Sequence, residues 1–294
     1  MILLKNCPIC SGKQLIKKLT CIDHSKSKEE FTIVSCGTCS FTFTNPRPKT
    51  NSLSEYYKSE TYISHTNSKK GITNFLYQIV RKYSIRKKLS LITAICKTGS
   101  LLDIGCGTGE FLNACKKNGY ITKGVEPSQI AREQATENFS LSVTKETNLK
   151  EFEKGSFEII TLWHVLEHMP EINTQIQNIK KILKSNGTLI VAVPNHKSWD
   201  ANYYKEYWAA WDVPIHLWHF SKTTITTLFK NNGFKLIKTK AMIFDSFYVS
   251  LLSEEFKHSK KHFIQAFLIG LISNIVGFFT KKGHSSMIYI FQKN

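Results

Sequence analysis

Three groups of residues in this chain have the types and the spacing that chemistry requires. Glycines recur at alternate positions after an apolar run, within residues 101–112, and an acidic residue precedes them. Histidines and a glutamate follow another apolar run, within residues 157–168, and two C-x-x-C pairs stand near the N-terminus. The first group predicts a pocket for a nucleotide-like ligand, the second proton transfer or metal binding, and the third a metal site.

The glycine group comprises Gly105, Gly107 and Gly109, with Asp103 before them. Glycine allows positive φ and a close approach of the backbone to a ligand. The G-x-G-x-G spacing differs from the G-x-G-x-x-G of dinucleotide folds, and no G-K-[ST] follows. Asp103 would repel a pyrophosphate but suits a ligand with a cationic amine. Glu126, which follows the next apolar segment, can accept hydrogen bonds from the ribose hydroxyls of an adenosine.

This order of features, together with the strand-like segment 187–193, strongly resembles the class I S-adenosylmethionine-dependent methyltransferases. In that family the glycine loop contacts the methionine part of the cofactor, and the acid after the second strand holds the ribose. A polar residue after the third strand, here Asn148, holds the adenine amine. The resemblance implies S-adenosyl-L-methionine as cofactor, bound by Asp103, Gly105, Cys106, Gly107, Gly109, Glu126, Pro127, Asn148 and His164.

The segment Trp163–Met169 has three interpretations. It matches the H-x-x-E-H pattern of zinc proteases, which we reject because the segment follows a strand inside a cofactor-binding domain. It also resembles the E-x-x-E-H segment of quinone-biosynthesis O-methyltransferases and small-RNA 2′-O-methyltransferases, which holds a divalent metal beside the acceptor hydroxyl. Glu167 and His168 match that motif, but His164 replaces its first glutamate. The third interpretation, which we favour, is a metal-free segment that shapes the cofactor pocket.

An aromatic-rich insertion follows residue 195 and ends in a segment that resembles the HL-x-HFS sequence of a large methyltransferase subfamily. His216 and His219 are its histidines, and Ile215 replaces the usual arginine. A neutral imidazole near a hydroxyl can take its proton as the methyl group moves. His168, His216 and His219 are therefore the candidate catalytic residues. A structural role, in which either His216 or His219 anchors a lid by hydrogen bonds, is the alternative.

Two cysteine pairs predict a zinc site near the N-terminus. Cys7 and Cys10 form one pair, and Cys36 and Cys39 form the other. Two such pairs supply a tetrahedral four-thiolate site, which leaves no position open for water and is therefore structural. A unit of this size cannot build much of a core, so the metal is expected to stabilise it.

The elements that must position these residues alternate between strand and helix. Apolar runs at 101–104, 121–125, 141–143, 157–162 and 187–193 alternate with helix-like segments at 111–118, 128–138 and 173–183. This alternation predicts an α/β fold with a doubly wound parallel sheet and a ligand at the C-terminal strand ends. The residues Asn186-Gly187 are expected to end the last of these helices in a left-handed conformation. The resemblance implies a seven-stranded Rossmann-like sheet whose last strands, 235–244 and 286–292, form an antiparallel hairpin.

The sequence divides into five parts. We expect a zinc-ribbon-like segment (1–45), a linker with lead-in helices (46–100), the catalytic domain (101–245), an apolar helical insertion (246–283) and a final strand of the catalytic sheet (284–294). The family resemblance suggests that Tyr56 and Tyr57 line the cofactor pocket.

Charge and hydropathy suggest partners. Lys and Arg number 40 against 22 Asp and Glu, a net charge of +18, which favours anionic partners or reflects a solvated lysine-rich surface. Residues 263–279 carry no charge and are flanked by lysines. They are short for a bilayer span, so we expect an interfacial helix pair, or a helix packed on the domain or at a dimer interface. Lys5 interrupts the apolar start, which indicates no signal peptide and predicts a cytoplasmic protein, free or peripheral at the inner membrane face.

The predicted activity is methyl transfer from S-adenosyl-L-methionine to a small or lipid-linked acceptor. Such an acceptor could be a sugar, a quinone precursor or a cell-envelope intermediate. The alternatives are an RNA methyltransferase, in which zinc ribbon and basic surface contact phosphates, and a non-catalytic module that only binds the cofactor.

Overall fold

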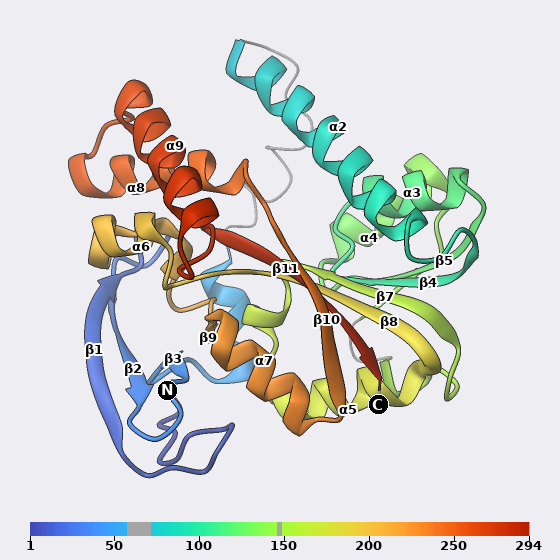
Figure 1. The fold of residues 1–294 in the computed structure, drawn as a ribbon, viewed down its shortest axis with the longest axis horizontal. Coiled ribbons are helices and arrows are strands. Elements are labelled where there is room, and N and C mark those ends of the chain that lie inside the picture. The colour runs from blue at the N-terminus through green and yellow to red at the C-terminus, as the bar shows by residue number, and fades with distance from the viewer. Residues whose placement is uncertain (58–71, 146–148, 294) are drawn as a thin grey trace.

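The computed structural model describes residues 1–57, 72–145 and 149–293, with the side chains of residues 72–77 outside this description. The described chain contains a seven-stranded sheet and a four-stranded sheet (Figure 1). The seven-stranded sheet has the order β10-β11-β8-β7-β4-β5-β6. Its strands are β4 (Gly99–Ile104), β5 (Tyr120–Val125), β6 (Val143–Thr144), β7 (Phe157–Trp163), β8 (Leu183–Pro194), β10 (Phe234–Ala241) and β11 (Ser286–Lys293).

The larger sheet is parallel except for β11, which runs antiparallel to both β8 and β10. The predicted α/β class and seven-stranded sheet are therefore confirmed. The sheet reverses its strand order between β4 and β7, where the carboxyl ends of parallel strands commonly bind ligands. The third strand begins at Val143, whereas the sequence places it at 141–143.

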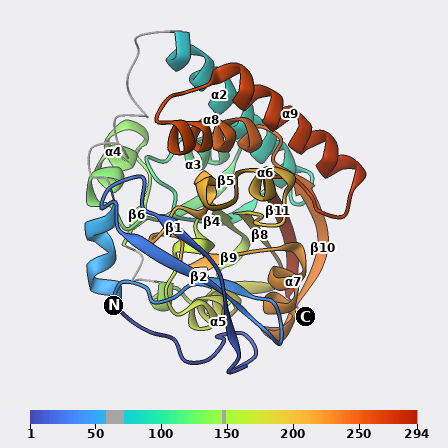
Figure 2. The same cartoon turned by 90° about the vertical axis from the view of Figure 1, so that its left-hand side faces the viewer.

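Helices cover both faces of this sheet (Figures 1 and 2). In β8, Leu189 and Val191 join the core that includes α5 and α7, whereas Ile190 and Ala192 join the core that includes α2 and α3. Successive side chains of a strand point to opposite faces, so a continuous apolar run fills both cores. The helices of these two layers are α2 (Ile72–Thr93), α3 (Glu110–Lys117), α4 (Gln129–Phe139), α5 (Ile172–Ile182) and α7 (Lys222–Asn231).

The end of α5 differs from the sequence prediction. The helix stops at Ile182, and Leu183 is already extended, with φ −76° and ψ 135°. Strand β8 begins there, so Asn186 and Gly187 lie within the strand and do not form a left-handed helix end. The prediction was wrong because Leu183 is fully buried beside Phe157 of β7 and continues the sheet, and this pairing overrides the local turn signal. By contrast, Ser221 caps α7 with a reciprocal capping box, in which Thr224 is the partner.

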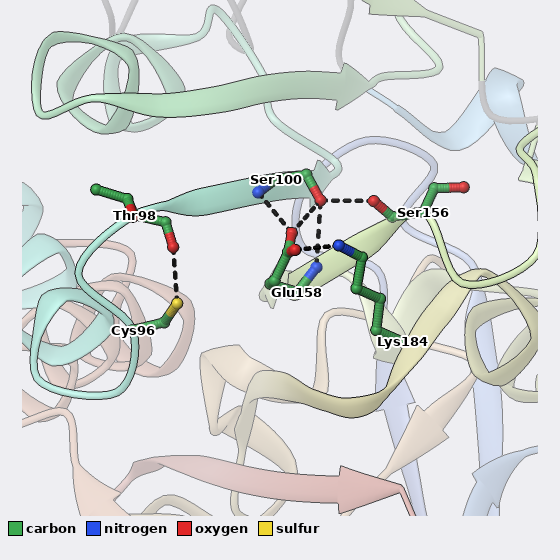
Figure 3. Close-up of polar contacts among 6 residues, drawn as sticks. All are labelled: Cys96, Thr98, Ser100, Ser156, Glu158 and Lys184. Atoms are coloured by element: carbon green, nitrogen blue, oxygen red, sulfur yellow. Dashed lines mark hydrogen bonds and ion pairs between the residues drawn. The ribbon is translucent and has the colours of Figure 1, made fainter.

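Polar contacts fix the end of the sheet opposite the strand carboxyl ends (Figure 3). The carboxylate of Glu158 in β7 accepts hydrogen bonds from the Ser100 backbone N–H (2.6 Å) and hydroxyl, and from Lys184 Nζ. Burial raises the pKa of Glu158, but these donors lower it to about 2. The Ser100 hydroxyl also donates to the Ser156 carbonyl oxygen, 2.5 Å away. The starts of β4, β7 and β8 are thereby joined.

The four-stranded sheet joins the N-terminal segment to the aromatic insertion. Its strands are β1 (Leu15–Ile22), β2 (Glu30–Cys36), β3 (Thr42–Thr44) and β9 (Trp218–His219). In this sheet β3 pairs antiparallel with β9, with Thr42 opposite His219 and Phe43 opposite Trp218. A zinc-ribbon-like segment that seems separate in the sequence thus shares a sheet with residues of the insertion.

Short helices complete the insertion and the lead-in region. Two longer helices, α8 and α9, lie between β10 and β11 and pack on each other. In the parts of the chain that the structure describes, these additional helices are η1 (Thr50–Tyr56), η3 (Leu166–His168), α6 (Trp199–Tyr204), η4 (Lys205–Tyr207), η5 (Ala209–Trp211), α8 (Asp245–His258) and α9 (Phe263–Phe279).

Candidate active site

The glycine loop connects β4 to α3. Gly105, Gly107 and Gly109 have φ values of 72°, 54° and 85°, which side-chain-bearing residues rarely adopt. A Cβ on Gly105 would lie 2.3 Å from the side chain of Val165, and one on Gly109 would lie 2.5 Å from Leu141. The sequence therefore needs glycine here both for backbone conformation and for close packing, and Gly105 brings the loop against the segment that follows β7.

Glu126 directly follows β5 and contacts the loop. One carboxylate oxygen accepts a hydrogen bond from the Gly107 backbone N–H, and the other from the Ser128 N–H, each at 2.9 Å. Its side chain is buried. Pro127 follows on the surface, where its carbonyl accepts from Arg132. The structure thus brings the predicted ribose-binding acid to the glycine loop.

Cys106 and Asn148 are two further residues of the predicted cofactor set. The Cys106 thiol is buried among apolar residues, and this burial raises its pKa. Its backbone N–H donates to Val125, 3.2 Å away. Asn148 lies outside the described residues.

Asp103 lies in β4, just before the loop, and is almost completely buried. It accepts a 2.5 Å hydrogen bond from the Thr161 hydroxyl of β7. Burial raises the pKa of Asp103 to about 7, and the Thr161 hydroxyl and the nearby Lys88 ammonium limit that rise. An ammonium group of a ligand placed beside Asp103 would lower this raised pKa. The carboxyl group would then be ionised and could pair with the ligand.

Lys88 of α2 was not singled out from the sequence, where it appears as one of several cations of a basic helix. Its ammonium lies 4.4 Å from the ring centroid of Trp163, and burial lowers its pKa. A signal was present, because Lys88 stands three and four residues before Leu91 and Ile92, which are buried. That spacing places it on the inner face of α2.

Glu167, His168 and His216 form a compact cluster beside this loop. One potential ligand atom from each lies within 4.8 Å of the others, and the rings of His168 and His216 are 4.5 Å apart. Glu167 is fully buried, and within the described chain neither of its carboxylate oxygens has a hydrogen-bond partner. The Tyr57 hydroxyl lies 3.2 Å from His168 Nδ1, which places this tyrosine in the cluster.

Hydrogen bonds orient the two imidazoles. The Nδ1 atom of His168 is 3.2 Å from the carbonyl oxygen of Ile215, and the Nδ1 atom of His216 is 2.9 Å from that of Ala210. Burial, together with the facing His216, lowers the pKa of His168 to about 3. His168 is therefore a neutral imidazole near neutral pH.

His164 lies next to this cluster with a left-handed backbone (φ 58°). Its Nε2 is 2.9 Å from a carboxylate oxygen of Asp245 at the start of α8, and its Nδ1 is 3.4 Å from Glu167. Burial lowers the pKa of His164, but the two carboxylates raise it to about 10. The sequence suggested cofactor contact for His164 and gave no reason to select Asp245, which lies far along the chain.

His219 and Tyr56 lie apart from the cluster of Glu167, His168 and His216. The Nε2 atom of His219 is 3.0 Å from the Thr44 hydroxyl of β3, and its ring packs edge-on against Trp211. This geometry favours the anchoring role for His219. The Tyr56 hydroxyl donates to Glu29, so its side chain packs against the N-terminal segment and not into the loop pocket.

The four predicted metal-binding cysteines converge. Cys7 Sγ is 3.5 Å from Cys39 Sγ, and Cys10 Sγ is 3.5 Å from Cys36 Sγ. All four potential ligand atoms lie within 4.8 Å of one another, which matches the sulfur spacing around a tetrahedral zinc ion. A Cβ on Gly12 would lie 3.1 Å from Cys36 Sγ and 3.3 Å from Cys10 Sγ, so the loop is shaped to close around the sulfurs.

Residues 77–239 match the family model described as a methyltransferase domain, which covers more than half of the chain. The ubiquinone biosynthesis O-methyltransferase of Actinobacillus pleuropneumoniae is 33% identical over 107 residues, which are 32% of this chain and 45% of that protein. The chain therefore spans about half the length of the curated relatives it matches.

Solved structures share the fold. The magnesium protoporphyrin IX methyltransferase of Synechocystis, solved with bound S-adenosylhomocysteine, aligns with 84% of this chain and all of its own, with a TM-score of 0.56 and 12% identity. A S-adenosylmethionine-dependent methyltransferase from Archaeoglobus fulgidus aligns with 76% of this chain and 100% of its own, with a TM-score of 0.51 and 18% identity. The seven-stranded sheet is therefore the sheet of such enzymes.

Proposed function

Because this chain belongs to the methyltransferase-domain family, we propose that it transfers a methyl group from S-adenosyl-L-methionine to a hydroxyl of a small or lipid-linked acceptor. The observation that carries this proposal is the contact between two halves of one site. Val165 packs on Gly105, so the cofactor-type loop with Asp103 and Glu126 adjoins the cluster of Glu167 and His168.

The loop half of the site fits the cofactor by charge and shape. The carboxylate of Asp103 would pair with the cofactor's amine, and that of Glu126 would accept from its ribose hydroxyls. The glycines give the loop the left-handed backbone conformation and the close packing that it needs. The cofactor supplies a methyl group on a positively charged sulfur, so the leaving group needs no acid. The protein's main task is then to hold the acceptor oxygen in line with that methyl group.

The histidine half of the site fits proton removal from the acceptor. His168 is neutral, and its ring faces His216 across 4.5 Å. A proton released by the acceptor hydroxyl would pass to this pair. The Tyr57 hydroxyl beside His168 is placed to orient the acceptor.

A divalent cation fits this half less well. The donor atoms of Glu167, His168 and His216 are close enough to share one. However, His164 replaces the carboxylate that the related motif supplies, and its pKa of about 10 makes it a cation 3.4 Å from Glu167. That charge already neutralises Glu167 and would repel a metal. We therefore assign no step to a metal at this position.

We also propose a structural zinc ion at Cys7, Cys10, Cys36 and Cys39. The closed set of four thiols leaves no coordination position for a substrate. Because β2 ends at Cys36 and β3 pairs with β9, zinc would stabilise the sheet that holds His219 and, through it, the insertion.

The name of a curated relative supports one acceptor within the proposed class. The curated relative from Actinobacillus pleuropneumoniae is named a ubiquinone biosynthesis O-methyltransferase, which supports a phenolic quinone precursor. A sugar or a cell-envelope intermediate remains within the proposed class. A net charge of +18 favours one rival, methylation of RNA, in which lysines and the zinc-binding segment contact phosphates.

A transfer assay with radiolabelled S-adenosyl-L-methionine tests the proposal. Hydroxylated polyprenyl phenols, nucleotide sugars and total RNA would be offered in parallel to the wild type and to His216→Asn. Label in a phenol or sugar, lost in the variant, is the expected result. Label in RNA, together with RNA binding that weakens steeply as the salt concentration rises, would show that RNA is the acceptor and would contradict a small or lipid-linked acceptor. Cofactor binding without label in any class would favour a binding module.

A further inference from the structure

Helix α9 is packed with its small and polar side chains inward and its large apolar side chains outward. The buried residues of this helix are Ala266, Ile269, Gly270, Ser273, Asn274 and Gly277. Its exposed large residues are Phe263, Ile264, Phe267, Leu268, Leu271, Ile272, Ile275, Phe278 and Phe279. A helix of a globular protein ordinarily shows the reverse arrangement.

The inward face is fixed by specific contacts. The buried Ser273 hydroxyl donates to Asp200 (2.6 Å), and the Asn274 amide donates to the Ser246 hydroxyl (2.8 Å). At Gly270 a Cβ would lie 3.0 Å from the backbone of Phe247, so the two helices touch there without room for a side chain. The helix cannot rotate its large residues inward without losing these contacts. The outward apolar face is therefore built into the fold.

The outward face is large and continuous. Ile264 is 79% exposed, Phe278 66% and Phe279 87%. Phe244 and Tyr248, before and within α8, are also exposed, and Tyr83 of α2 packs edge-on against Phe244. Figures 1 and 2 both place α8 and α9 at the same end of the molecule as α2. Exposed apolar surfaces of this extent mark interaction sites.

Charge surrounds this face but does not enter it. No residue of α9 is charged, whereas Lys257, Lys260 and Lys261 precede it and Lys281 and Lys282 follow it. Lys261 lies 3.5 Å from the exposed Glu255, and the Lys257 ammonium lies 5.4 Å from the Tyr203 ring centroid. Cations at both ends of an apolar face match a surface with an apolar interior and anionic head groups.

We propose that α9 is a docking surface for an anionic lipid bilayer, in which it lies in the plane of the interface. Its 17 residues span about 26 Å, less than the hydrocarbon core of about 30 Å. Within the described residues no helix is long and apolar enough to cross a membrane. The large apolar side chains enter the head-group boundary, and the lysines at both ends contact lipid phosphates.

A second copy of the chain suits this surface less well. Two α9 helices that pack face to face and antiparallel bring the lysines before one helix against the lysines after the other. No acidic residue of α9 is available to balance them. Like charges at both ends of such a pair oppose association, whereas anionic lipid relieves the same repulsion.

This inference does not depend on the proposed methyl transfer, although the two fit together. Helix α8 begins at Asp245, which pairs with His164 in the candidate site, and α8 packs along α9. The docking surface is therefore joined to the site by a single helix. A protein bound in this way would meet an acceptor that carries a lipid tail at the membrane surface.

Vesicle co-sedimentation of the full chain tests the proposal. The probe is phosphatidylcholine vesicles with and without about 30 mol% phosphatidylglycerol, and the expected result is at least about tenfold stronger partitioning to the anionic vesicles. The triple variant Ile264→Gln, Phe267→Gln, Leu268→Gln should lose about tenfold or more of this partitioning. Its matched control, Ile121→Gln with Ile237→Gln, removes exposed apolar side chains elsewhere and should bind as the wild type does.

A lysine pair gives a second, independent measurement. Lys281→Ala with Lys282→Ala should weaken binding to anionic vesicles about thirtyfold, at about one kcal/mol per lysine, and Lys150→Ala with Lys154→Ala should not. Titration of S-adenosylhomocysteine into each variant shows whether it is folded, independently of vesicles. The proposal would be overturned if the wild type did not bind anionic vesicles more strongly than neutral ones. It would also be overturned if the triple variant bound anionic vesicles as strongly as the wild type does. A wild-type dimer that the triple variant converts to monomer, without vesicle binding, would assign the face to a second copy instead.

Discussion

The Nε2 atom of His164 lies 2.9 Å from a carboxylate oxygen of Asp245, across a large separation in sequence. This ion pair joins the segment after β7 to the first residue of α8. It therefore connects the candidate site with the helices inserted between β10 and β11. The positive charge of His164 also balances Glu167, the buried carboxylate beside it.

Asp245→Asn should lower the free energy of unfolding by about 1 to 2 kcal/mol near pH 6, because both side chains are partly exposed. The pKa of His164 is raised from 6.5 to about 10. The stabilisation by this pair is fully present at a pH below the pKa that His164 has in the unfolded protein. It is lost as the pH rises through the pKa that His164 has in the folded protein. Urea unfolding at about pH 6 and about pH 10.5 measures the change.

The control for this pair is Glu255→Gln, which removes the exposed contact with Lys261 near the other end of α8. It should cost less than about 0.5 kcal/mol at either pH. An Asp245→Asn deficit that is the same at both pH values would contradict the assigned protonation of His164.

The affinity for S-adenosylhomocysteine should depend on pH through Asp103. Its pKa is about 7 in the ligand-free protein, and the ligand's ammonium needs the ionised carboxylate. Affinity should therefore fall as pH drops below 7, by at most about tenfold per pH unit, and level off above it. Asp103→Asn should bind more weakly and lack this dependence. Calorimetric titrations between about pH 6 and pH 8 provide the comparison. If the affinity of the variant changed with pH as that of the wild type does, Asp103 would not be the group that binds the amine.

His216 and His219 should respond differently to substitution. His216→Asn retains a donor near the Ala210 carbonyl, so we expect a nearly unchanged melting temperature and a loss of about 10²- to 10⁴-fold in kcat. His219→Gln keeps a group near the Thr44 hydroxyl and should leave kcat within about threefold, while His219→Ala should chiefly lower stability by about 1 to 3 kcal/mol. If His219→Gln instead abolishes turnover in a folded protein, the roles are reversed.

The purified protein should carry about one zinc ion per chain, measured by atomic absorption. Cys36→Ser should lose most of it and lower the melting temperature, because the four-stranded sheet then lacks its metal cross-link. Cys96→Ser is the matched control, since this thiol donates to the Thr98 carbonyl far from the cysteine cluster (Figure 3). Equal zinc in wild type and Cys36→Ser would exclude the four-cysteine site.

Features encoded by adjacent residues were predictable from the sequence. The strand, three glycines and Glu126 follow in order, and the structure brings them together at the strand ends. The four cysteines were equally evident, because their spacing alone limits how they can meet. Lys88 could have been recognised from its helical spacing to Leu91 and Ile92.

Features that depend on distant pairing were not predictable. The two-residue strand Trp218–His219 has no pattern of its own and forms because β3 offers an open edge. The pairing of His164 with Asp245 likewise depends on how α8 returns to the sheet. At Gly187 a local turn signal is overridden because the buried Leu183 already continues β8.

Calorimetric titration of S-adenosylhomocysteine measures whether the glycine loop and Glu126 bind S-adenosyl-L-methionine. The wild type should bind with micromolar affinity, and Glu126→Ala should bind about tenfold more weakly or worse, a loss of about 1.4 kcal/mol. Glu137→Ala, which removes an exposed glutamate of α4, should bind as the wild type does. A folded wild type that shows no binding would contradict the account, and the loop would then require another ligand.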